Sequence, residues 1–134
     1  MDWSCNALAP DDQSKNVQWD NDAKIITGAD KDDIYAGQYN TKHIIANQGV
    51  GMYAAQICAN YRGGGFADWY LPSKFELALL YLQKEANVVG NFASYYWSST
   101  ESDSKKAWTI SFDRGYQSKW GKDCTLRVRA IRAF

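Results

Sequence analysis

The sequence predicts an α+β fold: two helices packed on short antiparallel strands that long loops connect, in a single domain over residues 1–134. Three observations favour this class. A helix-start signature, Ser73-Lys74-Phe75-Glu76, follows Pro72. After Gly90, apolar and polar residues alternate with the period of a strand. Six Trp, nine Tyr and five Phe supply enough large side chains to fill one core in a chain of this length.

The first 40 residues are rich in Asp, Asn, Gly and Gln. Such composition is typical of loops, and we expect two short strands within them, near residues 17–19 and 24–27. Thr41 is expected to cap a short helix over 41–46. Gly49 and Gly51 break that helix, and a second helical stretch runs over 52–61 before the glycines at 63–65 end it.

The next helix has the clearest start. Pro72 restricts the residue before it to an extended shape, Ser73 is the expected N-cap, and Glu76 completes a capping box. The helix is predicted to continue to about Glu85. Its predicted buried face consists of Phe75, Ala78, Leu79, Leu80 and Leu82.

The sequence pattern of the C-terminal third predicts strands. Residues 95–100 form the first, and residues 107–112 alternate with one apolar face. Asp113-Arg114-Gly115 is a predicted hairpin turn, after which strands are expected over 116–120 and 126–133. The tryptophans expected in the core are Trp69, Trp97 and Trp108.

Charge is balanced over the chain but unevenly distributed. Residues 1–68 carry a net charge of −4 and residues 69–134 a net charge of +4, which favours an electropositive face as well as a plain mixed surface. Trp120 lies between two lysines and is a candidate for stacking on a sugar, with core packing as the alternative. Arg129 and Arg132 lie among apolar residues of the last strand and are interpreted as structural.

Other motifs favour structural interpretations. Gly49-Val50-Gly51-Met52-Tyr53-Ala54 matches a dinucleotide pattern but lacks the strand that should precede it. His43 has no catalytic partner in a known motif, and the acidic residues near 20–33 do not have EF-hand spacing. Cys58 is interpreted as a core residue, and Cys5 and Cys124 form the favoured disulfide, on the expectation that the two ends of the chain meet. No metal or other cofactor, no nucleic acid and no membrane span is predicted.

Several phrases resemble, in the same order, one family of bacterial surface domains: the C-terminal domain of the Legionella collagen-like adhesin (Lcl). The phrases are Leu8-Ala9-Pro10-Asp11-Asp12-Gln13-Ser14, Val17-Gln18-Trp19, Asn40-Thr41, Gln48-Gly49, Tyr53-Ala54-Ala55, Cys58, Gly64-Gly65-Phe66-Ala67-Asp68-Trp69-Tyr70-Leu71-Pro72-Ser73, Tyr96-Trp97-Ser98-Ser99-Thr100-Glu101, Ala107-Trp108 and Val128-Arg129-Ala130-Ile131-Arg132.

The resemblance implies a C-type-lectin-like fold at a secreted or cell-surface location. It also implies a homotrimeric tip on a collagen-like stalk that binds sulfated glycosaminoglycans or another acidic polysaccharide. Family members carry a further strand before the Leu8 phrase, so a shortened first strand is expected. The calcium-lectin motifs Glu-Pro-Asn and Trp-Asn-Asp are absent, as is the reactive cysteine pair of the related formylglycine-generating oxidases. We therefore expect calcium-independent binding and no enzyme activity.

Two functions remain open at this point: a polyanion-binding adhesin domain, and a trimerising cap of a collagen-like protein without glycan binding of its own. For the first, the predicted ligand-binding residues are Lys105, Lys106, Arg114, Lys119, Trp120, Lys122 and Arg127.

Overall fold

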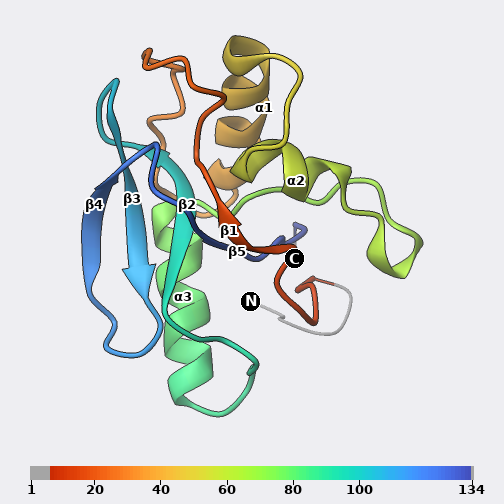
Figure 1. Cartoon of the computed structure of the whole chain (residues 1–134). Coiled ribbons are helices and arrows are strands. Elements are labelled where there is room, and N and C mark those ends of the chain that lie inside the picture. The colour runs from red at the N-terminus through yellow and green to blue at the C-terminus, as the bar shows by residue number, and fades with distance from the viewer. Residues whose placement is uncertain (1–6, 134) are drawn as a thin grey trace.

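A five-stranded sheet forms the centre of the fold, with helices packed on both of its faces (Figure 1). The structure is a computed structural model that describes residues 7–133. Its strands are β1 (Ser14–Val17), β2 (Tyr95–Glu101), β3 (Lys106–Ser111), β4 (Gln117–Gly121) and β5 (Leu126–Val128), and its helices are α1 (Ala36–Gln48), α2 (Ala54–Asn60) and α3 (Lys74–Glu85), with a short 3-10 turn at Gly63–Gly65. The α+β class is confirmed. The three α-helices correspond to the helical stretches predicted over 41–46, 52–61 and 73–85, so only the count of two helices in the predicted fold class was too low.

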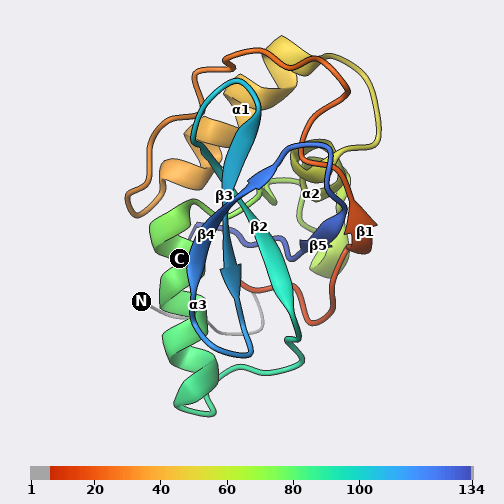
Figure 2. The same ribbon diagram turned by 60° about the vertical axis from the view of Figure 1, so that its left-hand side comes forward.

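The strand order is β1-β5-β2-β3-β4, which runs from right to left in Figure 2. All neighbours pair antiparallel except β2 and β5, which pair parallel where Tyr96 meets Arg127. The predicted all-antiparallel sheet is therefore wrong at one pairing. Two parallel neighbouring strands must be joined by a crossover connection. Here β3 and β4 form that connection: they lie on one side of β2, and the chain then crosses to the other side of β2 to form β5.

Alternation along β2 divides the core in two. Trp97 belongs to a cluster with Ile44 of α1 and Cys58 of α2. The neighbouring Tyr96 points to the other face and packs with Leu77 and Leu80 of α3. Trp69 and Trp97 are buried as predicted. Each indole N–H of Trp19 and Trp97 donates to a backbone carbonyl, at 2.9 Å, so neither buried donor is left unpaired.

The start of α3 confirms the predicted capping box: Ser73 Oγ accepts from the Glu76 N–H, and the Glu76 carboxylate accepts from the Ser73 N–H. The predicted buried face is correct for Leu80 and wrong for Phe75 and Leu82. Phe75 is 47% exposed and Leu82 is 58% exposed, whereas Leu77 and Leu80 point into the core. The helix is apolar on two sides, so its apolar residues alone do not indicate which side faces the sheet.

Helix α1 is longer than the helix predicted over 41–46, because a residue distant in the sequence caps its start. It begins after Tyr35, which adopts a left-handed conformation with φ 65° and provides no side-chain cap. Glu76 of α3 takes that role: its two carboxylate oxygens accept from the N–H groups of Gly37 and Tyr35, at 3.1 and 3.0 Å. Tyr70 donates its hydroxyl to the same carboxylate at 3.0 Å, and burial together with this carboxylate raises the pKa of Tyr70. One buried side chain thus caps two helices.

The predicted strand over residues 24–27 is a loop, in which Ile25 and Ile26 are exposed. The predicted break after α1 is confirmed: Gly49 has φ 79° and ends the helix, and α2 begins after Tyr53. The phrase Gly49–Ala54 therefore joins two helices and follows no strand, so the dinucleotide interpretation fails.

We expect Gly37→Ala to destabilise the fold by about 2–3 kcal/mol, because the new Cβ would meet the Leu71 carbonyl oxygen at 2.5 Å and the Glu76 carboxylate at 2.6 Å. Urea unfolding measures this. Gly90→Ala is the matched control, since no atom lies within 4 Å of its added Cβ. Equal stabilities of the two variants would contradict the role assigned to Glu76.

Candidate functional site

The predicted cations do not form one cluster. Lys105 and Lys106 are exposed at one end of the β3–β4 hairpin and Arg114 at the other. The strand between them, β3, has six residues, and at about 3.4 Å per residue its ends lie about 17 Å apart. Lys119 is exposed on β4, the edge strand, between these two ends. A single compact ligand therefore does not contact all four.

Lys122 was predicted as a surface cation, and this is wrong because its side chain is fully buried. Its ammonium group lies 2.7 Å from Glu101 Oε1, donates to the Ile25 carbonyl at 3.1 Å and lies 4.5 Å from the centre of the Trp19 ring. Glu101 also accepts from the Thr27 N–H at 2.9 Å. The pair fixes the loop over residues 24–27 to the sheet.

Arg127 is partly exposed, and Asp12 binds it at 2.9 Å. This hydrogen bond raises the pKa of the guanidinium. Asp12 also accepts from Arg129 Nε at 3.0 Å and from the Tyr96 hydroxyl at 2.7 Å, and burial together with this hydrogen bond raises the pKa of Tyr96 to about 12. The structural interpretation of Arg129 is confirmed, since its side chain is fully buried.

The same holds for Arg132, which pairs with Asp68 at 2.5 Å and lies over the Phe66 ring. The hydrogen bond from Arg132 lowers the pKa of the Asp68 carboxyl. Both arginines of the last strand therefore hold loops in place.

Trp120 is half-buried and packs against the core cluster that contains Trp97. Its ring centre lies 4.9 Å from that of Tyr95, and its indole N–H donates to Ser118 Oγ at 3.1 Å. Core packing, the alternative kept open above, accounts for its contacts. Because neighbouring strand residues point to opposite faces, Trp120 and Lys119 lie on opposite sides of β4.

A different tryptophan lies among lysines. Trp108 was predicted in the core but is only half-buried, and it pairs directly with Lys119 across the hairpin. The Lys119 ammonium lies 5.1 Å from the centre of its ring, and the Lys74 ammonium, from the first turn of α3, lies 3.7 Å away. Lys106 is two residues from Trp108 on β3 and shares its face. We call Lys74, Lys106, Trp108 and Lys119 the Trp108 face.

Two of these residues, Lys74 and Trp108, were absent from the predicted site. Lys74 lies within the capping-box sequence Ser73–Glu76. The start of a helix explains that sequence, so it does not indicate a ligand-binding residue. Trp108 follows the apolar alternation of β3, which does not show that its neighbour Ile110 packs with Leu77 and Leu80 of α3 while Trp108 itself meets only the Lys74 side chain of that helix and stays half-buried.

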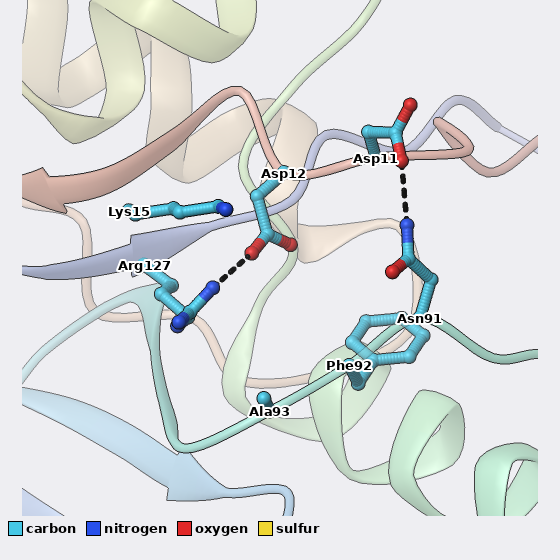
Figure 3. Close-up of a pocket in the computed structure, with 7 residues that line it drawn as sticks. All are labelled: Asp11, Asp12, Lys15, Asn91, Phe92, Ala93 and Arg127. Atoms are coloured by element: carbon cyan, nitrogen blue, oxygen red, sulfur yellow. Dashed lines mark hydrogen bonds and ion pairs between the residues drawn. The ribbon is translucent and has the colours of Figure 1, made fainter.

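A recess of about 290 Å³ lies at the opposite edge of the sheet, beside β1 (Figure 3). The residues that line it are Asp11, Asp12, Lys15, Asn91, Phe92, Ala93 and Arg127. Of the predicted site residues only Arg127 lies here. Lys15 was missed because it lies in the acidic half of the sequence, far from the predicted cations of residues 105–127.

The remaining predicted residues play structural roles or lie elsewhere. His43 is partly buried, with its ring 4.0 Å from that of Tyr39. Asp20, one of the acidic residues near 20–33, is buried and pairs with Lys24 at 2.7 Å. Cys58 is buried as predicted, and burial raises the pKa of its thiol. Cys5 lies outside the described residues, so its disulfide with Cys124 stays a prediction. Within residues 7–133 no three His, Cys, Asp or Glu side chains gather as a metal site.

The comparison with protein families matches the Lcl C-terminal domain over residues 9–132. The chain belongs to the Lcl C-terminal domain family. This membership indicates a surface-adhesin type of domain, in keeping with an extracellular location, and the family is not a known enzyme family. No curated protein matches the chain. In the described part of this Lcl-family domain, no helix has the length and apolar character needed to cross a membrane.

We expect Lys122→Met to destabilise this Lcl-family domain by about 3–5 kcal/mol, because it leaves the Glu101 carboxylate buried without its cation. Lys105→Met is the matched control: Lys105 is exposed, and surface changes of this kind usually stay within about 0.5 kcal/mol. Thermal or urea unfolding compares them. If both variants unfold alike, Lys122 is not the buried partner of Glu101.

Proposed function

We propose that this domain is an extracellular adhesin domain that binds sulfated glycosaminoglycan-type polyanions, without calcium, through the Trp108 face. One observation carries the proposal: lysines from α3, β3 and β4 converge around one half-buried tryptophan of β3, the strand next to the edge of the sheet. The C-type-lectin-like form of the fold belongs to the same proposal and rests on the family's resemblance. Calcium independence rests on the absence of the calcium-lectin motifs from the sequence.

The arrangement suits a linear polyanion better than a small ligand. Lys106 and Lys119 lie along adjacent strands, and Lys105 extends the row of exposed cations beyond the end of β3. A chain that lies along the hairpin meets these amines in turn and releases condensed counterions at each contact. Each exposed contact is weak and is screened beyond about 8 Å at physiological salt, so several contacts are needed for useful affinity.

Within the Trp108 face, Lys74 is held in one position against the Trp108 ring. The Lys74 backbone N–H donates to Thr100 Oγ1 at 2.9 Å, so the start of α3 is tied to β2. The Lys74 ammonium then rests on the Trp108 ring, an arrangement that stabilises a cation by about 0.5–2 kcal/mol. A cation held in place loses less side-chain entropy when it binds a sulfate.

We expect the double variant Lys106→Ala/Lys119→Ala to leave immobilised heparin at lower salt than the unsubstituted domain. The slope of log affinity against log salt should fall by about one to two, one for each lost contact. The matched control is Lys42→Ala, which removes an exposed lysine of α1. An unchanged slope in the double variant, or an equal loss in the control, would remove the Trp108 face from the site.

The second candidate, a trimerising cap of a collagen-like protein, is favoured by a separate observation. Phe75, Ala78, Leu79 and Leu82 lie at three- and four-residue spacing on α3, which places them on one face. Ala78 packs against the core, whereas Phe75 and Leu82 are 47% and 58% exposed. An exposed apolar helix face of this kind is typical of an interface, and three copies would also multiply the affinity of the Trp108 face.

If α3 joins copies of the chain, Leu82→Glu should convert a trimer into monomers in light scattering. Val50→Glu is the control, because Val50 is 97% exposed on the loop after α1. The cap hypothesis fails if the unsubstituted domain is monomeric at tens of micromolar, or if Leu82→Glu remains trimeric.

A further inference from the structure

The two edges of the sheet differ in their regularity. At one edge, β1 has only four residues, and its register with β5 shifts between Ser14 and Val17. At the other edge, β4 pairs with β3 in one unbroken register from Gln117 to Gly121, and Figure 1 shows β4 as the outermost strand on its side. An irregular edge resists pairing with a further strand, whereas a regular one presents a continuous row of backbone groups. The β4 edge is therefore the one that a further strand can join.

The backbone groups of Gln117 and Lys119 point away from β3. The Lys122 N–H donates to the Lys105 carbonyl at 2.8 Å. In an antiparallel pair, hydrogen-bonded residues alternate with residues whose backbone groups point outward. Every second residue of β4 counted back from Lys122 therefore bonds to β3, and Gln117 and Lys119, which lie between, point outward. Among the described residues, none bonds to these outward N–H and carbonyl groups. Such a row of alternating donors and acceptors is the complement of another strand.

A strand added at this edge meets a cation at its centre. Gln117 pairs with Ile110 and Lys119 pairs with Trp108, so both side chains lie on the face of the sheet that packs against α3. Lys119 is exposed and makes no ion pair within residues 7–133. A residue opposite Lys119 in the added strand lies about 5 Å away, where an opposite charge is favourable. That position favours an acidic residue.

A recess of about 280 Å³ adjoins the Gln117 end of β4. The residues that line it, which we call the Phe75 recess, are Asp32, Asp33, Lys74, Phe75, Ala78 and Gln117. Phe75 is 47% exposed and supplies an apolar surface. Asp32 and Asp33 are exposed and make no ion pair in the described part of the chain, whereas the single cation, Lys74, rests on the Trp108 ring. A long basic side chain suits this recess, because its methylene groups pack on apolar surface while its charged end meets carboxylates.

A second copy of the chain is a poor occupant of the edge. Two β4 strands that pair antiparallel about Lys119 bring the two Lys119 side chains opposite each other, and like charges in that position are unfavourable. Charged residues on edge strands commonly prevent such self-pairing. The same lysine leaves the edge open to a strand of complementary charge.

We propose that β4 binds an extended segment of another protein, which joins the five-stranded sheet as a further antiparallel strand. The segment carries an acidic residue opposite Lys119 and, two residues later, a basic residue opposite Gln117 that enters the Phe75 recess. Antiparallel pairing is more stable per residue than parallel pairing, and it sets this order of acid before base. Backbone hydrogen bonds supply the affinity and the two side chains supply the specificity. Because the two charges cancel, the interaction is distinct from polyanion binding by the Trp108 face and does not rest on it.

The test is a titration of the ¹⁵N-labelled full chain with a short, acetylated and amidated peptide of threonine and valine that carries one glutamate and, two residues later, one lysine. The backbone amides of Gln117 and Lys119 should shift saturably. Methylation of the glutamate backbone nitrogen removes the N–H that donates to the Lys119 carbonyl, and it should weaken binding by about tenfold. A peptide with the glutamate and lysine exchanged has the same net charge and should also bind about tenfold more weakly.

Variants of the domain test the same contacts from the other side. Gln117→Pro removes an outward N–H, a change that an edge strand tolerates, and should weaken the peptide by about tenfold. Gln117→Ala keeps that N–H and should bind within about twofold. Neither substitution touches the Trp108 face, so heparin retention should not change. Asp32→Asn/Asp33→Asn should reduce the preference for the original peptide over the exchanged one.

Three results would overturn the proposal. The first is a methylated peptide that binds as tightly as the unmethylated one, which decides the question on the unsubstituted domain even if Gln117→Pro does not fold. The second is a folded Gln117→Pro variant with full affinity for the peptide. The third is an equal shift of the Gln117 and Lys119 amides when the domain is concentrated without peptide, which would assign the edge to a second copy. If heparin is never retained while the peptide binds, polyanion binding alone fails.

Discussion

The carboxylate of Glu76 holds the helical part of the fold together. It receives hydrogen bonds from four donors: the N–H groups of Tyr35, Gly37 and Ser73 and the hydroxyl of Tyr70. A buried carboxylate without such partners is strongly destabilising, so the starts of α1 and α3 must meet around it. This close approach is possible because Gly37 has no side chain in the space between the two helices.

Two further buried acids fix the long loops in the same way. Glu101 binds Lys122 and the Thr27 backbone, and Asp12 binds both arginines of the β5 segment. Loops without regular structure pay a high conformational entropy to become ordered, and hydrogen bonds to a charged group are stronger than neutral ones. The walls of the recess beside β1 are therefore positioned by the same interactions that stabilise the fold.

The success of prediction from sequence depends on how local each signal is. The start of α3 was predicted because Ser73 and Glu76 are three residues apart and cap one another, and β2 and β3 were predicted from alternation along a single strand. The start of α1 was missed because its cap, Glu76, lies 39 residues from Gly37. Lys122 was misassigned because it sits in a turn among polar residues, and its partner Glu101 is 21 residues away. The interpretation of Arg129 as structural was confirmed: its side chain is fully buried, as are its neighbours Val128 and Ala130.

The opposite charges of the two halves of the chain have a structural role. Asp12 and Asp68, from the acidic half, pair with Arg127, Arg129 and Arg132 from the basic half, so part of the imbalance is neutralised when the halves fold together. The cations that remain exposed on the basic half are concentrated on the β3–β4 hairpin, which forms one edge of the sheet. Lys15 and Arg127 present their charges at the other edge. The charge that the pairs between the halves leave over is thus divided between the two edges of the sheet, and the proposed polyanion site uses the share on the β3–β4 hairpin alone.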